Sequence, residues 1–250
     1  MGHRFAKRGS AAGTGRRFHG VIVDRIDEGA DRPGEDFALL CPHYAGMDAA
    51  LADLIGSLPV GDANGAILAA IPSCRPGPGL YAGILAADPF RPGPMLLAAL
   101  KGCGVRAVVN LPTVAMLGHS LGLALSHAGI DYAAELRTLA HAATLGLDAM
   151  AVVSTAAQAA AAAAVGIGAI MVHPGPAARD PEVNRSRVAA IAAIVAAVRA
   201  IDPGLCVLVF RHPGFDGILD PVGDQADGVV DWAIRPYDGV LAPGSTAKSF

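Results

Sequence analysis

The chain has 250 residues, of which 53% are hydrophobic and 16% are charged, and its formal net charge is −3. This length is sufficient for one large domain with a well-buried core. So apolar a chain is not disordered, and the lack of a basic patch beyond the first 17 residues argues against nucleic-acid binding.

The four cysteines are dispersed and show no C-x-x-C spacing, which excludes a zinc ribbon or a thioredoxin-like site. We expect them to be reduced and the protein to be cytoplasmic. The basic N-terminal stretch lacks the apolar core of a secretory signal. Gly166 and Gly168 interrupt the charge-free run 156–172, so we expect no membrane span.

The N-terminal part of the chain gives the weakest pattern. Residues 3–10 are expected to form a first strand, although they carry many cations. Apolar residues at 18, 21, 22 and 26 then recur at three and four positions, which predicts a helix that ends near Gly29.

From residue 37 onward, short apolar runs alternate with helical spacing. The expected strands are 37–41, 81–86, 107–111, 149–153, 169–172, 206–210 and 238–241. The expected helices are 47–55, 66–71, 95–101, 132–145, the alanine-rich run after 155, and 188–200.

Residues 80–114 contain a complete strand, helix, strand unit, and a crossover of this length makes the two strands parallel. About eight such alternations predict an α/β fold, a single-domain (β/α)8 TIM barrel over residues 1–250. A doubly wound open sheet is the alternative, but it normally has a glycine-rich turn after a strong first strand. The chain stops soon after Thr246, so we expect the eighth outer helix to be missing or truncated. A homo-oligomer contact or the N-terminal segment would then cover that face.

Polar residues follow the expected strands, at the edge where parallel α/β folds meet their ligands. His173 and His212 end neighbouring strands, so their imidazoles are expected to lie about one strand spacing apart, roughly 5 Å. With Asp88 they suit either a divalent metal or acid and base catalysis. Asp88 followed by proline equally suits the start of a helix, since aspartate is a good N-cap.

A second group of residues is expected to bind substrate or a small anion. Two glycine-rich turns would lie side by side after strands one and eight, where barrels often bind phosphate. The candidates are Gly13, Thr14, Gly15, His43, Asp62, Asn64, Asn110, Thr113, Gly175, Gly244, Ser245 and Thr246. For Asn110 and Thr113, which flank Pro112, the alternative is that they only cap a turn.

Three motifs, in this order, resemble the phosphoenolpyruvate hydrolase-like family of TIM barrels: 58–64 (LPVGDAN), 87–90 (ADPF) and 110–114 (NLPTV). His173 is similar to the family's strand-six histidine, and His212 with the following Pro-Gly is similar to its His-Gly-Gly. The sequence departs from the family at Arg16-Arg17 and at 42–44, where members carry a Ser-Ala-Lys-like run and an Asn-Ser-Gly-Arg-like strand end.

The resemblance implies a hydrolase or lyase that acts on a small 2-oxo acid or its phospho or phosphono derivative, such as phosphoenolpyruvate or phosphonopyruvate. In this hypothesis Asp88 holds Mg²⁺ or another divalent metal, and His173 and His212 move protons. The alternative is a non-catalytic regulatory barrel that senses a small anionic metabolite and acts through a protein interface.

Overall fold

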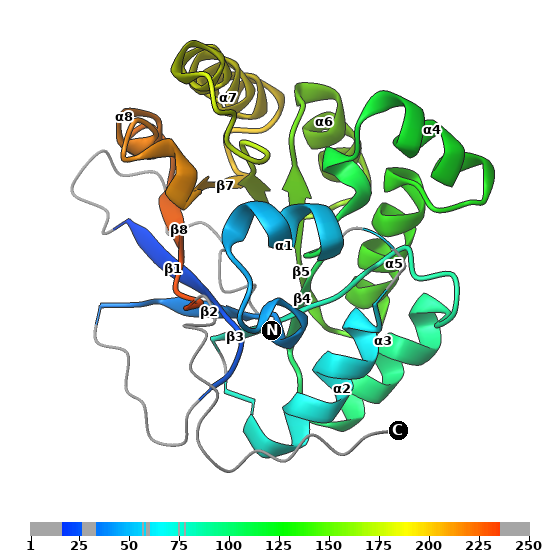
Figure 1. The fold of residues 1–250 in the computed structure, drawn as a ribbon. Coiled ribbons are helices and arrows are strands. Elements are labelled where there is room, and N and C mark those ends of the chain that lie inside the picture. The colour runs from blue at the N-terminus through cyan, green and yellow to red at the C-terminus, as the bar shows by residue number, and fades with distance from the viewer. Residues whose placement is uncertain are drawn as a thin grey trace, which may run out of the picture.

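Eight parallel strands form a closed barrel in chain order in a computed structural model that describes residues 17–26, 34–56, 58, 61–74, 76–77 and 79–235 (Figure 1). The strands are β1 (Phe18–Val23), β2 (Phe37–Leu40), β3 (Leu80–Gly83), β4 (Ala107–Val109), β5 (Asp148–Val153), β6 (Ala169–Val172), β7 (Cys206–Arg211) and β8 (Gly228–Trp232). Strands β1 and β8 pair with each other, so the barrel has no free edge. The predicted barrel is therefore confirmed.

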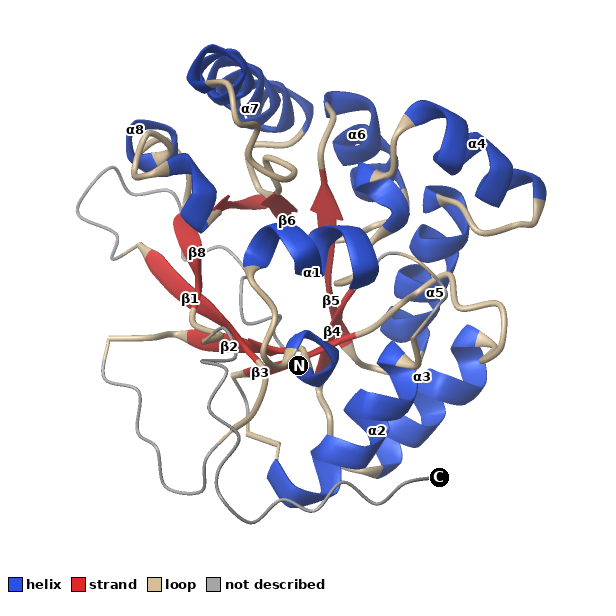
Figure 2. Cartoon of the chain, in the orientation of Figure 1, coloured by secondary structure: helices blue, strands red, loops and turns tan. Residues whose placement is uncertain are grey.

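The described helices lie mainly above and to the right of the strands in the view of Figure 2. They are α1 (Ala49–Gly56), α2 (Ala63–Cys74), α3 (Gly93–Gly102), α4 (His119–His127), α5 (Tyr132–Thr144), α6 (Ala156–Ala164), α7 (Pro181–Ile201) and α8 (Asp220–Gly223). Short 3-10 helices follow β2, β4 and β7: η1 (Pro42–Tyr44), η2 (Val114–Met116) and η3 (Pro213–Phe215). The segment after β8, which bears on the predicted loss of an outer helix, lies outside the described residues. Within the described part of the chain, no helix is both long and apolar enough to cross a bilayer.

Strand β1 lies where the sequence predicted a helix, and that prediction is wrong. Phe18, Val21 and Ile22 imitate helical spacing because the second half of this strand, Val21–Val23, is apolar on both faces, as buried parallel strands are. Phe18 and Ile22 pack inside the barrel, whereas Val21 packs on its outer side. Gly20 makes room for a neighbour, since a Cβ atom there would lie 2.2 Å from the ring of Phe37.

The last strand also differs from the prediction. Strand β8 comprises Gly228–Trp232, whereas the predicted range 238–241, like the expected first strand at 3–10, lies outside the described residues. Asp231 interrupts the apolar run that would have revealed β8. Its carboxylate accepts a hydrogen bond from Arg211 Nε at 2.7 Å and contacts His19 Nε2 at 2.8 Å. A charged residue on the outer face of a strand therefore interrupts the apolar pattern by which the strand would be predicted, even when other strands supply its partners.

Helix α7 begins at Pro181 rather than at 188. The carboxylate of Asp180 accepts a hydrogen bond from the Glu182 amide at 2.9 Å, so Asp180 caps the helix and Pro181 begins it. Polar residues fill the first turns, and apolar spacing alone therefore missed them. The remaining predicted elements from residue 37 onward agree with the structure to within about three residues.

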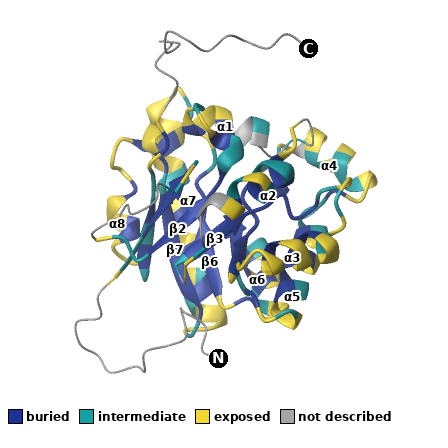
Figure 3. Ribbon diagram, turned by 90° about the horizontal axis from the view of Figure 1, so that it is seen from below, coloured by how far each residue is buried: buried dark blue, intermediate teal, exposed yellow. Residues whose placement is uncertain are grey.

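Two apolar layers hold the fold together. Leu39, Met150 and Leu208 belong to the inner layer that fills the barrel, and Leu97 and Val195 belong to the outer layer between strands and helices. Figure 3 shows the buried strands beneath the exposed helix surfaces. The inner layer becomes aromatic at the carboxyl end of the barrel, where the candidate site lies.

Replacing Gly83 of β3 by alanine is expected to destabilise the protein, because this residue faces the crowded barrel interior. An added Cβ would lie 2.5 Å from Cys41 Sγ and 2.6 Å from the backbone oxygen of Leu111. We expect the free energy of unfolding to fall by about 1–3 kcal/mol in urea denaturation. Gly168→Ala is the control, since a Cβ there meets no atom within 4 Å. Equal losses in the two variants would contradict the packing explanation.

Candidate functional site

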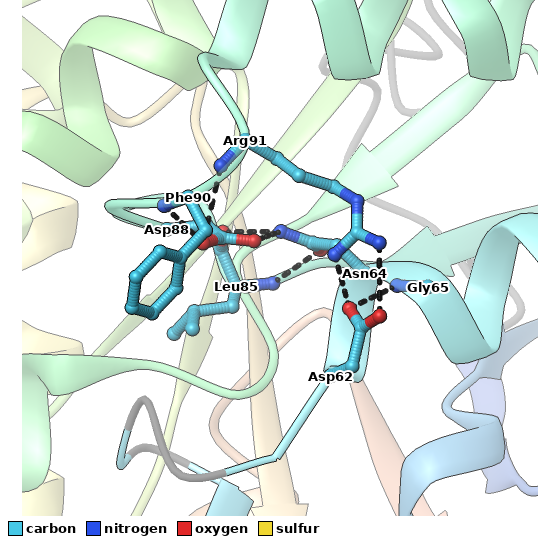
Figure 4. A network of polar contacts seen from close by, with 7 residues as sticks. All are labelled: Asp62, Asn64, Gly65, Leu85, Asp88, Phe90 and Arg91. Atoms are coloured by element: carbon cyan, nitrogen blue, oxygen red, sulfur yellow. Dashed lines mark hydrogen bonds and ion pairs between the residues drawn. The ribbon is translucent and has the colours of Figure 1, made fainter.

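Two of the family-like motifs meet at the carboxyl end of β3, in a group that we call the β3 clasp: Asp62, Asn64, Leu85, Asp88 and Arg91 (Figure 4). Asn64, in the first turn of α2, is completely buried. Its Nδ2 donates to the Leu85 oxygen at 3.0 Å and to Asp88 Oδ2 at 2.8 Å, and its Oδ1 accepts from the Leu85 amide at 3.0 Å. The side chain of Asn64 therefore fastens helix α2 to the end of β3.

Asp88 serves the same clasp. Its Oδ1 accepts hydrogen bonds from the amides of Phe90 at 2.8 Å and Arg91 at 3.3 Å, in addition to the bond from Asn64 to Oδ2. Asp62 lies at the exposed end, where it accepts from the Gly65 amide at 2.7 Å and pairs with Arg91. The hydrogen bond from Arg91 lowers the pKa of Asp62. Asp88 thus caps the turn that follows it and does not start helix α3, which begins at Gly93 with Pro92 as its N-cap, so the helix start expected at Asp88 is wrong.

The described residues do not fit a divalent metal centred on Asp88. Both of its carboxylate oxygens already accept hydrogen bonds, one from a side chain and the other from two backbone amides. No group of three or more His, Cys, Asp or Glu side chains in the described ranges is arranged to hold a metal ion. The role of Asp88 as a metal ligand remains a prediction from the sequence.

The third family-like motif surrounds a buried carboxyl that the sequence did not reveal, that of Glu135 in α5. Its Oε2 accepts from Asn110 Nδ2 at 2.7 Å and Thr113 Oγ1 at 2.6 Å, and its Oε1 accepts from the Val114 amide at 2.8 Å. Asn110 Oδ1 also accepts from the Val152 amide at 2.7 Å. Asn110 and Thr113 therefore tie β4 to β5 and α5, and both are completely buried.

Burial raises the pKa of Glu135 from 4.5 to about 7, although the hydrogen bonds from Thr113, Val114 and Asn110 act in the opposite direction. The sequence did contain an indication of this position. Glu135 lies four residues before Leu139, on the helix face that packs inward. A carboxyl on the apolar face of a helix needs buried partners, and the polar end of β4 supplies them.

The two imidazoles expected at the barrel mouth do lie together. His173 follows β6 and His212 follows β7, and their ring centroids are 6.3 Å apart, somewhat more than the strand spacing expected. Phe210 contacts both rings, at centroid distances of 4.7 Å and 5.6 Å. The two histidines are 2% and 3% exposed, so their hydrogen bonds form in surroundings of low polarity.

Each histidine precedes a Pro-Gly pair, and in both pairs the glycine amide donates a hydrogen bond to the histidine ring. The Gly175 amide donates to His173 Nδ1 at 2.9 Å, and the Gly214 amide donates to His212 Nδ1 at 3.0 Å. Gly175 has a φ of 73°, which favours glycine, and a Cβ on Gly214 would lie 2.6 Å from Ala177 Cβ. Because Nδ1 accepts in both rings, each neutral imidazole carries its proton on Nε2.

His43 lies across the mouth from this pair and is connected to it by aromatic contacts. Its ring lies 4.0 Å from that of Tyr44, which lies 5.6 Å from Trp232, which in turn lies 6.5 Å from Phe210, all between centroids. Burial lowers the pKa of His43 from 6.5 to about 4, so it is uncharged at neutral pH. It therefore lacks the positive charge that would attract an anion. The glycine-rich turns at 13–15 and 244–246 lie outside the described residues, and their anion site stays a prediction.

A closed barrel of eight parallel strands with polar groups at its carboxyl end defines a (β/α)8-barrel protein with its candidate site at that end. Residues 31–212, more than half of the chain, match the phosphoenolpyruvate hydrolase-like family, and the chain belongs to this family. The resemblance expected from the three motifs is thereby confirmed.

Two relatives extend this relationship. The chain is 30% identical over 141 residues to the uncharacterized protein y4oT of Sinorhizobium fredii (strain NBRC 101917 / NGR234). The aligned region covers 55% of this chain and 70% of y4oT. It is 28% identical over 214 residues to the ToMV susceptible protein tm-1(GCR26) of Solanum lycopersicum, which covers 82% of this chain. The chain spans only 27% of the length of that tomato protein.

A crystal structure of a candidate phosphonomutase from Burkholderia cenocepacia J2315 is similar over 86% of both chains, with 16% sequence identity and a TM-score of 0.46. A similarity at this level does not bear on the reaction.

Replacing Asn64 by alanine is expected to destabilise the protein much more than breaking the ion pair at the exposed end of the clasp. Asn64→Ala leaves the buried amide and oxygen of Leu85 without their side-chain partner, so we expect a loss of about 2–4 kcal/mol in urea unfolding. Arg91→Ala is the matched control, because it removes only a solvent-exposed ion pair, and such pairs contribute little to stability. Similar losses in both variants would show that Asn64 is not the structural centre of the clasp.

The buried carboxyl of Glu135 is expected to make stability depend on pH. In the unfolded chain it ionises near 4.5, and in the folded protein near about 7. Between these values the folded state retains the extra proton, so the contribution of this carboxyl to stability is complete below about 4.5 and disappears as the pH rises through about 7. Urea unfolding across this window should give a shallower decline for Glu135→Gln than for the wild type. Parallel profiles for the two proteins would refute this assignment.

Proposed function

We propose that this protein is a hydrolase or lyase that binds a small 2-oxo acid, or its phospho or phosphono derivative, against His173 and His212. Membership of the phosphoenolpyruvate hydrolase-like family supports the substrate class. The observation that carries the proposal is the repeated His-Pro-Gly arrangement at the ends of β6 and β7, which holds two imidazoles in the same tautomer.

Two N–H donors on neighbouring strands suit the oxygens of a carboxylate, an oxo group or a phosphonate. Rings 6.3 Å apart can donate to two different oxygens of one small substrate. Because the backbone amides fix both rings, the donors are oriented before the substrate arrives, and such donors stabilise negative charge that develops on a substrate oxygen.

This geometry changes the role of the two histidines from the one expected from the sequence. An imidazole that accepts at Nδ1 can take up a second proton only if it breaks its bond to the backbone amide. We therefore assign them the donation of hydrogen bonds rather than the transfer of protons. A divalent metal has no matching donor set of three His, Cys, Asp or Glu side chains among the described residues.

A non-catalytic barrel that senses a small anion is the second candidate, and a specific observation favours it. Asp88, Asn64, Asn110 and Thr113, which the sequence offered as site residues, use their polar atoms to hold the fold rather than to face a substrate. Such a site would bind an anion without converting it.

Two substitutions of His173 separate its contact with the backbone from its contact with a substrate. Each new side chain reproduces the hydrogen bonding of only one of the two ring nitrogens. Asparagine can accept from the Gly175 amide but loses the donor at the Nε2 position, whereas glutamine retains a donor near that position. We expect His173→Asn to weaken binding of phosphonopyruvate by at least about tenfold in calorimetry, and His173→Gln to weaken it much less. Wild-type affinity in His173→Asn would exclude this histidine from the site.

Turnover then distinguishes the two candidate functions. Phosphate release from phosphonopyruvate and phosphoenolpyruvate would be measured with and without Mg²⁺. Release that falls in His173→Asn supports the enzyme, and binding without release supports the sensor. No binding of either compound would overturn both.

A further inference from the structure

A cavity of about 390 Å³ lies outside the barrel wall, between helices α3 and α5 and the end of β3. Helices α3 and α5 lie side by side there, and neither His173 nor His212 lines the space (Figure 1). The volume falls in the range of small-molecule sites, roughly 300–1,000 Å³. This cavity is therefore separate from the site proposed at the barrel mouth.

Small residues create the space. Ala87, which follows β3, and Ala134, in the first turn of α5, line it, and Ile130, just before α5, adds an aliphatic surface. Gly93 in the first turn of α3 lets the two helices approach closely at one end, since a Cβ there would lie 2.7 Å from Thr138 Oγ1. The apolar part of the cavity thus suits a short aliphatic group.

Helix α5 also brings basic side chains to the cavity. Arg137 and His141 are four residues apart on this helix, on the same face as Ala134, and both line the cavity. The Arg137 guanidinium forms no ion pair with an acidic side chain of the described residues. Helix α3 begins here without a side-chain cap, and the start of a helix adds positive potential.

One carboxylate also borders the cavity, that of Asp88, and it is already engaged. Its oxygens accept from Asn64 and from the amides of its own loop (Figure 4). These donors stabilise the negative charge of Asp88, which stays in place, so an anion in the cavity depends on Arg137 for a counter-charge.

We propose that this cavity is a second binding site, which takes a small organic carboxylate with a short aliphatic body. The carboxylate pairs with Arg137 and His141, and the aliphatic part packs on Ala87, Ile130 and Ala134. A guanidinium binds a carboxylate through two parallel hydrogen bonds, which makes Arg137 the main determinant of affinity. The site does not depend on the proposed reaction at the barrel mouth.

The test uses the full chain, propionate as the probe and propionamide as its uncharged counterpart. Two-dimensional NMR would follow the Ile130 methyl group and the amides of Gly129 and Ala134 during each titration. We expect saturable shifts at these positions with propionate and not with propionamide. Arg137→Ala should weaken propionate binding at least about tenfold, since a hydrogen bond to a charged group is lost.

Two further variants complete the design. Arg106→Ala removes an equally exposed arginine just before β4, at the opposite end of the barrel, and should bind propionate like the wild type. Ala134→Leu fills the cavity while keeping Arg137, and should abolish the shifts. The proposal is overturned if propionate gives no saturable shift, if Arg137→Ala binds as the wild type does, or if only the amides of Gly175 and Gly214 at the mouth respond.

Discussion

The fold depends on which groups form hydrogen bonds with the backbone amides and carbonyls just beyond the ends of its short strands. A strand of three to six residues soon leaves the sheet, and its next amides and carbonyls are buried but have no strand partner. Side chains supply those partners here: Asn64 bonds both backbone groups of Leu85, and Asn110 accepts from Val152. The imidazoles of His173 and His212 do the same for the amides that follow them. The polar residues at the carboxyl end of this barrel are thus first of all parts of its framework.

Much of this architecture could be predicted from the sequence, because strands β2 to β7 are apolar runs bounded by glycine, proline or polar residues. The two strands that close the barrel could not, and the reasons are physical. The second half of strand β1 is apolar on both faces, so its spacing imitates a helix, and Gly20 is explained only by the Phe37 ring that it admits. Strand β8 contains Asp231, whose partners Arg211 and His19 come from strands 20 or more residues away in sequence. Long-range pairing of this kind leaves no local pattern.

The position of the candidate residues in the fold could be predicted, but their contacts could not. Asp88, Asn110 and His212 follow parallel strands, and such strands bring the residues after them to one rim. Sequence spacing cannot show which atoms of a side chain are already used. In the sequence, Asp88 and Asn110 look like candidate reactive groups. Only the hydrogen bonds of Asp88 with Asn64 and of Asn110 with Glu135 show that the two side chains hold the rim in place. Glu135 escaped notice because an acid in a helix is ordinarily assigned to solvent.

The rim is consequently divided into two halves with different chemistry. On the side of β3 to β5, carboxylates and amides bond to one another and to the backbone, which gives rigidity. On the side of β6 and β7, each imidazole uses Nδ1 for the backbone and carries its proton on Nε2, so its second nitrogen is a donor of fixed direction. Because the backbone amides fix both rings, recognition by this half needs no charge on the protein. An anion held by neutral donors in a buried site avoids the cost of burying a second ion, and this is the physical reason to look for ligand chemistry at β6 and β7.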